Sequence, residues 1–465
     1  MRLTKEFKLR LKTVLCLSIA TAMHSNSFAT NVFNLEGFGP VSRALGGAGV
    51  AHDIGAAGMM YNPATLGLMD EGSQVYVGLD AIITDISTKN VATGENIDSS
   101  SKGNNRDPYF APQAAYSRSN GNMAFGVGVF AQGGLGTEFG SNSFLSDTTT
   151  NSVETGLDNS SRLLNLRIPF AGSYKVNDKL TLGGSVDAVW TSLNLGLLLD
   201  VTQVGALAAD GRVTGALVPT LLGVPDLSGA HFDFTRDQIV GGGVDAWGLG
   251  GKLGLTYQAT PRTRIGASYN LETNVSDLKG KATLTAVSST VGNIPLSGDI
   301  VIRDFQNPAQ LSLGVSHKVN NKLTIVGDVQ RVFWKDAMKD IDVGFVDGAS
   351  GQNIDIKLPL NYDDINIYTV GAEYQHNNKW TFRAGYSHSD QATPSNTTFA
   401  VIPAYVTDHL TGGISYALSK NSKLDLALSH AFEKKKNNSS QPNTSIPIQS
   451  SHSQNNIAVG YTHNF

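Results

Sequence analysis

Alternation of apolar and polar residues is the dominant pattern of this chain. Fourteen stretches between Gln74 and Phe465 repeat with a period of two, as expected for β-strands with one apolar and one polar face. The connections between these stretches are alternately long and short, which is typical of a closed barrel in a bacterial outer membrane. We expect strands near residues 74–87, 108–118, 122–131, 162–175, 179–195, 246–258, 263–275, 307–318, 322–335, 365–376, 379–390, 407–418, 423–434 and 454–465.

The connections also predict the orientation of the barrel. Six are short turns rich in Gly, Asn, Asp and Pro, the residues that tolerate tight reversals, and seven are long. This count places both chain ends on the short-turn side, which is the periplasm in outer-membrane barrels. The long connections span residues 88–107, 132–161, 196–245, 276–306, 336–364, 391–406 and 435–453.

Charged residues within the strands support a wall that faces lipid. Arg167, Asp187, Lys252 and Arg383 each fall on the face opposite to the large apolar residues of their strand. A basic residue at the lipid midplane costs roughly 2–4 kcal/mol, so we expect these charges to point into the lumen. A soluble β-sandwich or propeller also alternates, but it would need neither an export signal nor the regular change of connection length.

The first 29 residues have the composition of a secretory signal. A basic start is followed by an apolar run from Val14 to Ala22 and by Ser27-Phe28-Ala29, which suits cleavage. The only cysteine, Cys16, lies in this segment, so the mature chain has no thiolate metal site, and we expect no cofactor. Removal of the segment takes away five basic residues and one acidic residue, which moves the net charge from −4 to −8 and argues against nucleic acid as a partner.

Residues 30–72 lack the alternation and are rich in glycine. They fit neither a strand nor a nucleotide-binding loop, because no Lys-Ser/Thr follows the glycines and no strand precedes them. We expect a compact irregular segment, called the hatch below, that folds back into the lumen and lines it with Phe33, Leu35 and Phe38. The chain thus divides into a signal peptide (1–29), a hatch (30–72) and a fourteen-stranded barrel (73–465).

Short motifs in the hatch and the strands resemble the FadL family of outer-membrane transporters for long-chain fatty acids and aromatic hydrocarbons. The matching residues are Ala44, Gly47, Gly49, Ala51 and Asp53, then Asn62-Pro63-Ala64, Phe110-Ala111-Pro112, the run 134–139 and the run 380–385. The resemblance covers nearly the whole mature chain. It implies passive, non-catalytic transport through a fourteen-stranded barrel plugged by a hatch.

The resemblance also implies a route with three stations. An apolar groove between the third and fourth extracellular loops (196–245 and 276–306) would capture the substrate. Its residues in the third loop are Leu217, Val218, Leu221 and Leu222, which could also pack together as a cap, and both roles are compatible. The substrate would then pass to a pocket between the hatch and the barrel wall, where the turn Asn62-Pro63-Ala64 would gate the hatch, or serve as a static anchor. The substrate would leave sideways through a kink in the third strand, for which Gly126 and Gly128 are the candidates.

The identity of the substrate stays open at this stage. A carboxylate substrate calls for a basic residue, yet the end of the fifth strand, Trp190 to Leu195, contains none, so fatty acid and neutral hydrocarbon both remain. The expected partners are a hydrophobic small molecule and outer-membrane lipid, with the protein acting as a monomer. The alternatives are a diffusion porin, an adhesin or a hydrolase; no Ser-His-acid constellation or metal-ligand spacing supports the last.

Overall fold

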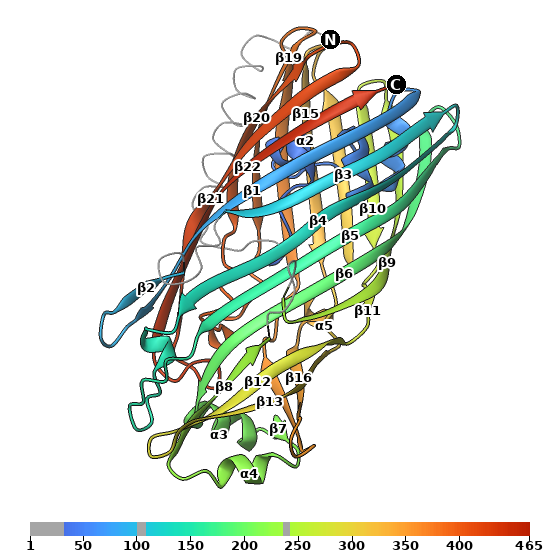
Figure 1. Cartoon of the computed structure of the whole chain (residues 1–465). Coiled ribbons are helices and arrows are strands. Elements are labelled where there is room, and N and C mark those ends of the chain that lie inside the picture. The colour runs from blue at the N-terminus through green and yellow to red at the C-terminus, as the bar shows by residue number, and fades with distance from the viewer. Residues whose placement is uncertain (1–31, 100–107, 236–241) are drawn as a thin grey trace.

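The computed structural model describes residues 32–99, 108–235 and 242–465, and the predicted signal peptide lies outside them. Fourteen antiparallel strands close into a ring, each paired with the next and the last with the first (Figure 1). They are β1 (Gly72–Asn90), β3 (Tyr109–Asn120), β4 (Met123–Gly140), β5 (Asn159–Lys175), β6 (Leu180–Asp200), β9 (Val244–Thr260), β10 (Thr263–Asn270), β14 (Gln310–Lys318), β15 (Leu323–Val332), β18 (Ile365–Gln375), β19 (Trp380–Ser389), β20 (Asp408–Ala417), β21 (Ser422–Asn438) and β22 (Ile448–Asn464). The predicted all-β barrel of fourteen strands is confirmed.

The two ends of the chain close the ring. β22 pairs with β1 from Gln74 opposite Asn464 to Asn90 opposite Ile448. The backbone N–H of Phe465 donates to the carbonyl of Ser73 at 2.8 Å, which extends the closure to the last residue. Every strand thus has a paired neighbour on each side, which satisfies most backbone hydrogen bonds of the wall without water, as a membrane requires.

The wall is apolar outside and charged inside, as the alternation predicted. Val186 and Leu253 are 62% and 63% exposed on the outer face. Their sequence neighbours, Asp187 on β6 and Lys252 on β9, point inward and are buried. The Asp187 carboxylate is 2.6 Å from Lys252 Nζ and 2.8 Å from Arg167 Nε, so one buried carboxylate pairs with two basic side chains in the lumen.

Three of the predicted long loops contain further strands that lengthen the molecule beyond the ring (Figure 1). β6 also extends beyond its predicted end into this region, where residues 191–200 are buried on both faces. The elements of this extension are α3 (Val201–Ala209), β7 (Val213–Thr214), α4 (Val218–Leu222), β8 (Leu227–Phe234), β12 (Leu278–Ser288), β13 (Gly292–Arg303), β16 (Asp340–Asp347) and β17 (Asn353–Pro359). β13 and β17 alternate in burial but were expected to be parts of loops. Smaller elements are β2 (Asn96–Asp98), η4 (Phe144–Ser146), β11 (Asn274–Val275), α5 (Trp334–Ala337) and η5 (Ser395–Thr397).

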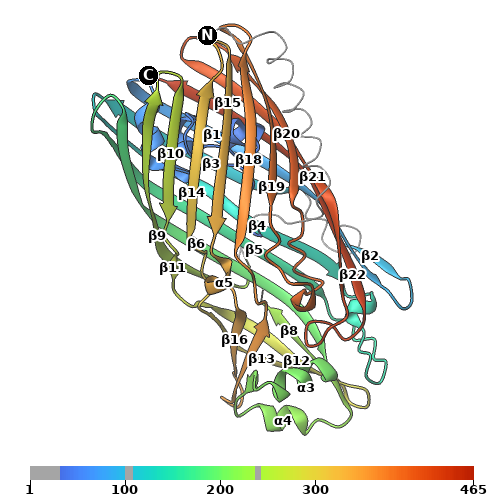
Figure 2. The same cartoon turned by 180° about the vertical axis from the view of Figure 1, so that it is seen from behind.

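Residues 32–71 lie inside the ring, at the end opposite to the extension (Figure 2). They form α2 (Gly39–Ala44), η2 (Gly55–Met60) and η3 (Pro63–Leu68), joined by irregular turns. The carboxylate of Asp328 on β15 accepts the backbone N–H groups of Gly49 and Val50 at 2.7 and 3.0 Å. None of the helices in the described part of the chain is long and apolar enough to cross a membrane.

Inward-facing glycines of the wall make room for the hatch. A Cβ added at Gly371 would lie 2.7 Å from the carbonyl oxygen of Leu45, and one at Gly413 would lie 2.6 Å from the Cβ of Ala44. At Gly266 the added atom would overlap the carbonyl of Val50. The backbone of the hatch therefore packs directly on the backbone of the wall, which only glycine permits.

Candidate functional site

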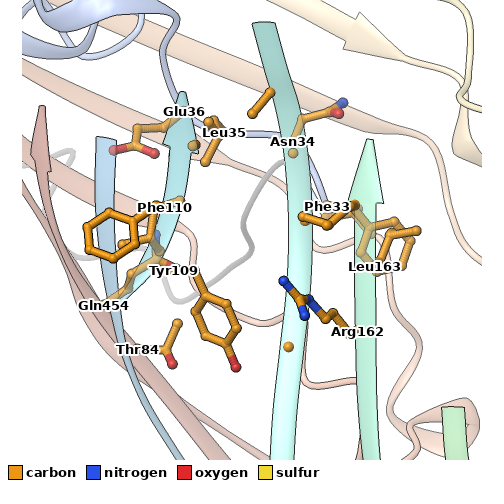
Figure 3. Close-up of a pocket in the computed structure, with 18 of the residues that line it drawn as sticks. Phe33, Asn34, Leu35, Glu36, Thr84, Tyr109, Phe110, Arg162, Leu163 and Gln454 are labelled. Carbon is orange, nitrogen blue, oxygen red and sulfur yellow. The ribbon is translucent and has the colours of Figure 1, made fainter. Parts of the chain in front are cut away.

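A cavity of about 90 Å³ lies where the first described residues of the hatch approach the wall (Figure 3). Its surface is mainly apolar and comes from the hatch and from β1, β3, β4, β5, β20 and β22. Figure 3 shows the rings of Phe33, Tyr109 and Phe110 around the opening. The lining residues are Val32, Phe33, Asn34, Leu35, Glu36, Ile82, Thr84, Ile86, Tyr109, Phe110, Ala111, Ala131, Gly133, Gly134, Gly136, Arg162, Leu163, Leu164, His409, His452 and Gln454.

The wall is interrupted beside this cavity. The pairing of β3 with β4 ends at Gln113 and Phe130, although β3 continues along β1 as far as Tyr109. Beyond Phe130, β4 continues along β5, with a register shift between Ala131 and Gly133. β3 and β4 therefore diverge over the stretch where β4 contributes Ala131, Gly133 and Gly134 to the cavity.

The hatch occupies the place that β3 leaves empty. Asn34 forms a β-bridge with Gly133, the N–H of Leu35 donates to Gln132 O at 3.1 Å, and the N–H of Gly134 donates to Phe33 O at 2.8 Å. Among the lining residues, Phe110 is 60% exposed on the outer face, whereas Phe33 is buried inside. Residues that face outward and residues that face the lumen thus both line the cavity. The hatch pairs with β4 there as a short extra strand.

The irregularity in this strand differs in position from the predicted one. Gly126 pairs regularly with Ser117 and Ala171, and its missing side chain makes room for Met59 of the hatch. Gly128 pairs with Ala115 on β3, but the pairing with β5 is interrupted there, between Val127 opposite Phe170 and Phe130 opposite Arg167. A kink at Gly128 therefore stays a prediction. The register shift lies further along, at Gln132, beyond the predicted end of the strand at residue 131. The predicted strand ended at residue 131 because the alternation stops at Gln132-Gly133-Gly134, a sequence typical of a turn. It therefore excluded the residues at which the register shifts.

Two of the three predicted hatch lining residues contact the cavity. Phe33 and Leu35 line it, and the ring of Phe33 packs edge-on against Trp334 with centroids 5.7 Å apart. Phe38 instead packs against Tyr61 at 5.4 Å and borders a second cavity of about 40 Å³. That second cavity has a polar lining that includes Gln132, Arg167, Gln310 and Gln330, so the segment 34–36 separates an apolar cavity from a polar one.

The Asn-Pro-Ala turn lies away from the apolar cavity and is firmly held. Asn62 is fully buried, and its side-chain N–H groups donate to Val50 O at 2.8 Å and to Leu255 O on β9 at 2.9 Å. Its side-chain oxygen accepts the N–H of Ala64 at 3.1 Å and so caps η3. These bonds favour the anchor alternative for Asn62, Pro63 and Ala64, while a gating role stays a prediction.

A buried ion network that sequence reasoning missed fixes the hatch below the cavity. Arg43 is fully buried; its guanidinium contacts Glu36 at 2.5 Å and Asp80 on β1 at 2.9 Å. Gln113 on β3 donates to Asp80 at 2.7 Å. Glu36 precedes α2, Arg43 lies within this helix, and Asp80 is 37 residues from Arg43, so no sequence spacing signals their contact.

The charge of Glu36 is stabilised by this network. Burial alone would raise its pKa, but the positive charges of Arg43 and His409 and a hydrogen bond from Asn456 outweigh burial and lower the pKa from 4.5 to about 2. Since the folded value is depressed, the stabilisation is present above pH 4.5 and is lost as the pH falls towards 2. Glu36 is therefore a carboxylate under all physiological conditions.

The four predicted residues of the third loop divide into two groups. Leu217 and Leu221 are buried in one apolar cluster with Leu207 and Ile354, and Val218 is half-buried against it. Leu222 is 63% exposed on α4. The buried pair supports the cap alternative, and a capture role stays a prediction that rests mainly on Leu222. In the described ranges, no three His, Cys, Asp or Glu residues are grouped to hold a metal ion.

A closed barrel with an internal hatch and an apolar cavity through its wall defines an outer-membrane transporter for apolar molecules. Comparisons with known proteins identify the family. Residues 16–465 match the family described as "Outer membrane protein transport protein (OMPP1/FadL/TodX)", and the chain belongs to it. Its members are outer-membrane transporters of hydrophobic compounds, so the predicted location, family and general function are confirmed.

Solved structures and curated relatives agree with this assignment. The Ralstonia pickettii toluene transporter TbuX is 54% identical, with a TM-score of 0.79 over 93% of this chain and 99% of that one. The P. putida toluene transporter TodX is 43% identical, with a TM-score of 0.83 and the same coverage. The long-chain fatty acid transport protein of Escherichia coli is 24% identical over 435 residues, 90% of this chain and 89% of its own length.

Proposed function

We propose that this protein carries small aromatic hydrocarbons such as toluene across the outer membrane, without catalysis and as a monomer. The observation that carries the proposal is the apolar cavity whose walls come from both faces of the barrel, at the place where β3 and β4 diverge. The two toluene transporters named above share far more sequence with this chain than the fatty acid transporter does.

The size of the cavity favours a single ring over a long chain. Its volume of about 90 Å³ is somewhat smaller than the roughly 150 Å³ of an engineered cavity that binds benzene. A modest displacement of Phe33 and Leu35 would admit one ring. A long-chain fatty acid would require a much larger opening. Volume and not charge makes this distinction, because Arg162 is one of the lining residues.

The proposed route ends in the lipid rather than in the periplasm. The substrate is captured at the third loop near Leu222, enters the cavity, and leaves between β3 and β4 past Phe110 and Gly134 when residues 33–35 withdraw from β4. An apolar molecule gains roughly 0.8 kcal/mol per CH₂ by staying out of water, so lateral release into the hydrocarbon core needs no energy source. The outlet in this proposal is at Gln132 to Gly134, not at Gly126 and Gly128.

The proposal is tested by uptake in a bacterial host that lacks its own members of this family. Cells that produce the protein should accumulate radiolabelled toluene faster than cells with an empty vector, and labelled oleate at the vector rate. Rapid oleate uptake with no gain for toluene would reverse the assignment of substrate.

We expect Leu222→Asp to lower toluene uptake about fivefold at concentrations well below saturation. The exposed side chain lies on α4 in the third loop, and loss of about 1 kcal/mol of apolar contact corresponds to that factor. Val91→Asp is the matched control, because Val91 is 53% exposed but follows β1, in a different loop. Equal uptake by the two variants would remove the third loop from the route.

A further inference from the structure

One corner of the apolar cavity, formed by His452 and Gln454, is polar. It offers hydrogen-bond acceptors to a ligand. His452 on β22 lines the cavity and is 4% exposed. Its Nδ1 lies 2.8 Å from the carbonyl oxygen of Pro403. Because a carbonyl only accepts, Nδ1 carries the proton, and in a neutral imidazole Nε2 is then an acceptor. Nε2 is buried and makes no hydrogen bond of good geometry with the described residues, although the side chain of Gln454 lies beside it.

The orientation of the neighbouring amide follows from a chain of hydrogen bonds that starts at the hatch. Glu36 is a carboxylate and can only accept, so the 2.9 Å contact with Asn456 fixes the Asn456 amide as the donor. The Asn456 oxygen then points to Gln454, whose amide N–H donates to it at 2.8 Å. This leaves the carbonyl oxygen of Gln454 as a second acceptor on a residue that lines the same cavity (Figure 3).

A hydrocarbon does not complete this site. Buried acceptors without a donor are costly, and a ring that carries only C–H groups offers His452 Nε2 no donor. A ring with one hydroxyl group supplies an O–H to the acceptor while the remainder of the ring contacts Phe33, Phe110 and Leu163. Sites built to hydrogen-bond a substrate group discriminate against the analogue that lacks it, because their own polar groups are then left unpaired.

We propose that the cavity selects monohydroxylated aromatic compounds, such as phenol and cresols, and that His452 Nε2 accepts the phenolic O–H, with the carbonyl oxygen of Gln454 as the second acceptor at this corner. The inference rests on the proposed function and extends it: toluene still enters the cavity, but its monohydroxylated derivatives bind there more tightly. His452 is a specificity-determining residue in this proposal.

The test compares p-cresol with toluene, two ligands that differ by one hydroxyl group. Equilibrium dialysis of the purified full chain in detergent with each radiolabelled ligand gives both affinities for wild type, His452→Leu and Gln454→Leu. His430→Leu is the control, because His430 is an exposed histidine that lies outside the cavity. Unchanged heat-modifiable migration on a gel verifies that each variant retains the folded barrel.

Wild type and His430→Leu should bind p-cresol about five times more tightly than toluene, since one net hydrogen bond is worth about that factor. His452→Leu should abolish the preference through a loss of p-cresol affinity, with toluene affinity unchanged or raised. Gln454→Leu should reduce the preference in the same direction.

Two outcomes would overturn the inference. Equal affinities of wild type for the two ligands would mean that bound water, not substrate, satisfies His452. A parallel loss of both affinities in His452→Leu would mean that the residue only shapes the cavity. Either result leaves the proposed function intact if cells still take up toluene, whereas absence of toluene uptake by wild type counts against the proposed function itself.

Discussion

Joining the hatch to the wall with a disulfide is expected to stop toluene uptake under oxidising conditions and to restore it on reduction. The variant carries Asn34→Cys and Gln132→Cys, whose native side chains are in hydrogen-bond contact at 3.2 Å. Residues 33–35 bridge β4 in the wall gap, so a covalent link at this place prevents their withdrawal. Uptake should fall at least tenfold, towards the rate of the empty vector.

The chain suits this experiment because Cys16, its only cysteine, lies in the predicted signal peptide. The mature variant then contains only the two introduced thiols, at positions whose native side chains are in contact. Each single variant, with or without oxidant, should transport like wild type. Full uptake by the oxidised double variant, with the disulfide verified by mass spectrometry, would show that the hatch segment does not move during transport.

Removal of the buried arginine is expected to release the hatch from the wall. Arg43→Gln leaves the carboxylates of Glu36 and Asp80 buried without their cation, and such a loss costs about 3–5 kcal/mol. The barrel strands keep their own hydrogen bonds, so the effect should be local. Backbone amides of α2 should exchange with deuterium about a hundredfold faster, and single-channel conductance in planar bilayers should rise from the low level of a plugged barrel.

Arg331→Gln is the matched control for this variant. Arg331 also pairs with an aspartate, Asp364 at 3.1 Å, but its side chain is 41% exposed, and exposed pairs contribute at most about 1 kcal/mol. Exchange in α2 and conductance should stay at wild-type values. If Arg43→Gln behaved like this control, the ion network would not be what fixes the hatch.

The barrel could be predicted from the sequence because its determinants are local. An outward Val186 and an inward Asp187 follow directly from the period of a strand in a wall with lipid on one side. Strand ends were less predictable, since both faces of β6 become buried beyond Trp190 and the alternation stops there. β12 loses the alternation in its second half, whereas β13 alternates in burial and was nevertheless expected to be part of a loop.

The cavity could not be predicted because it arises from contacts between distant segments. At the interruption beside Gln132, β4 contacts Asn34, which lies 98 residues earlier in the chain. The sequence around either residue gives no sign of this contact. The predicted kink at Gly126 and Gly128 relied on glycine as a mark of irregular strands. In the structure Gly126 serves instead to let Met59 of the hatch pack against the wall.

Lateral passage through the wall is the central claim, and photolabelling tests it most directly. A toluene analogue with a trifluoromethyl diazirine, irradiated with the protein in outer-membrane vesicles, should label residues on both sides of the gap, notably Phe33 and Leu163 inside and Phe110 outside. Peptide mass spectrometry locates the adducts. Labels confined to the polar cavity near Gln310 and Gln330, with none at Phe110, would place the route along the lumen and contradict the account.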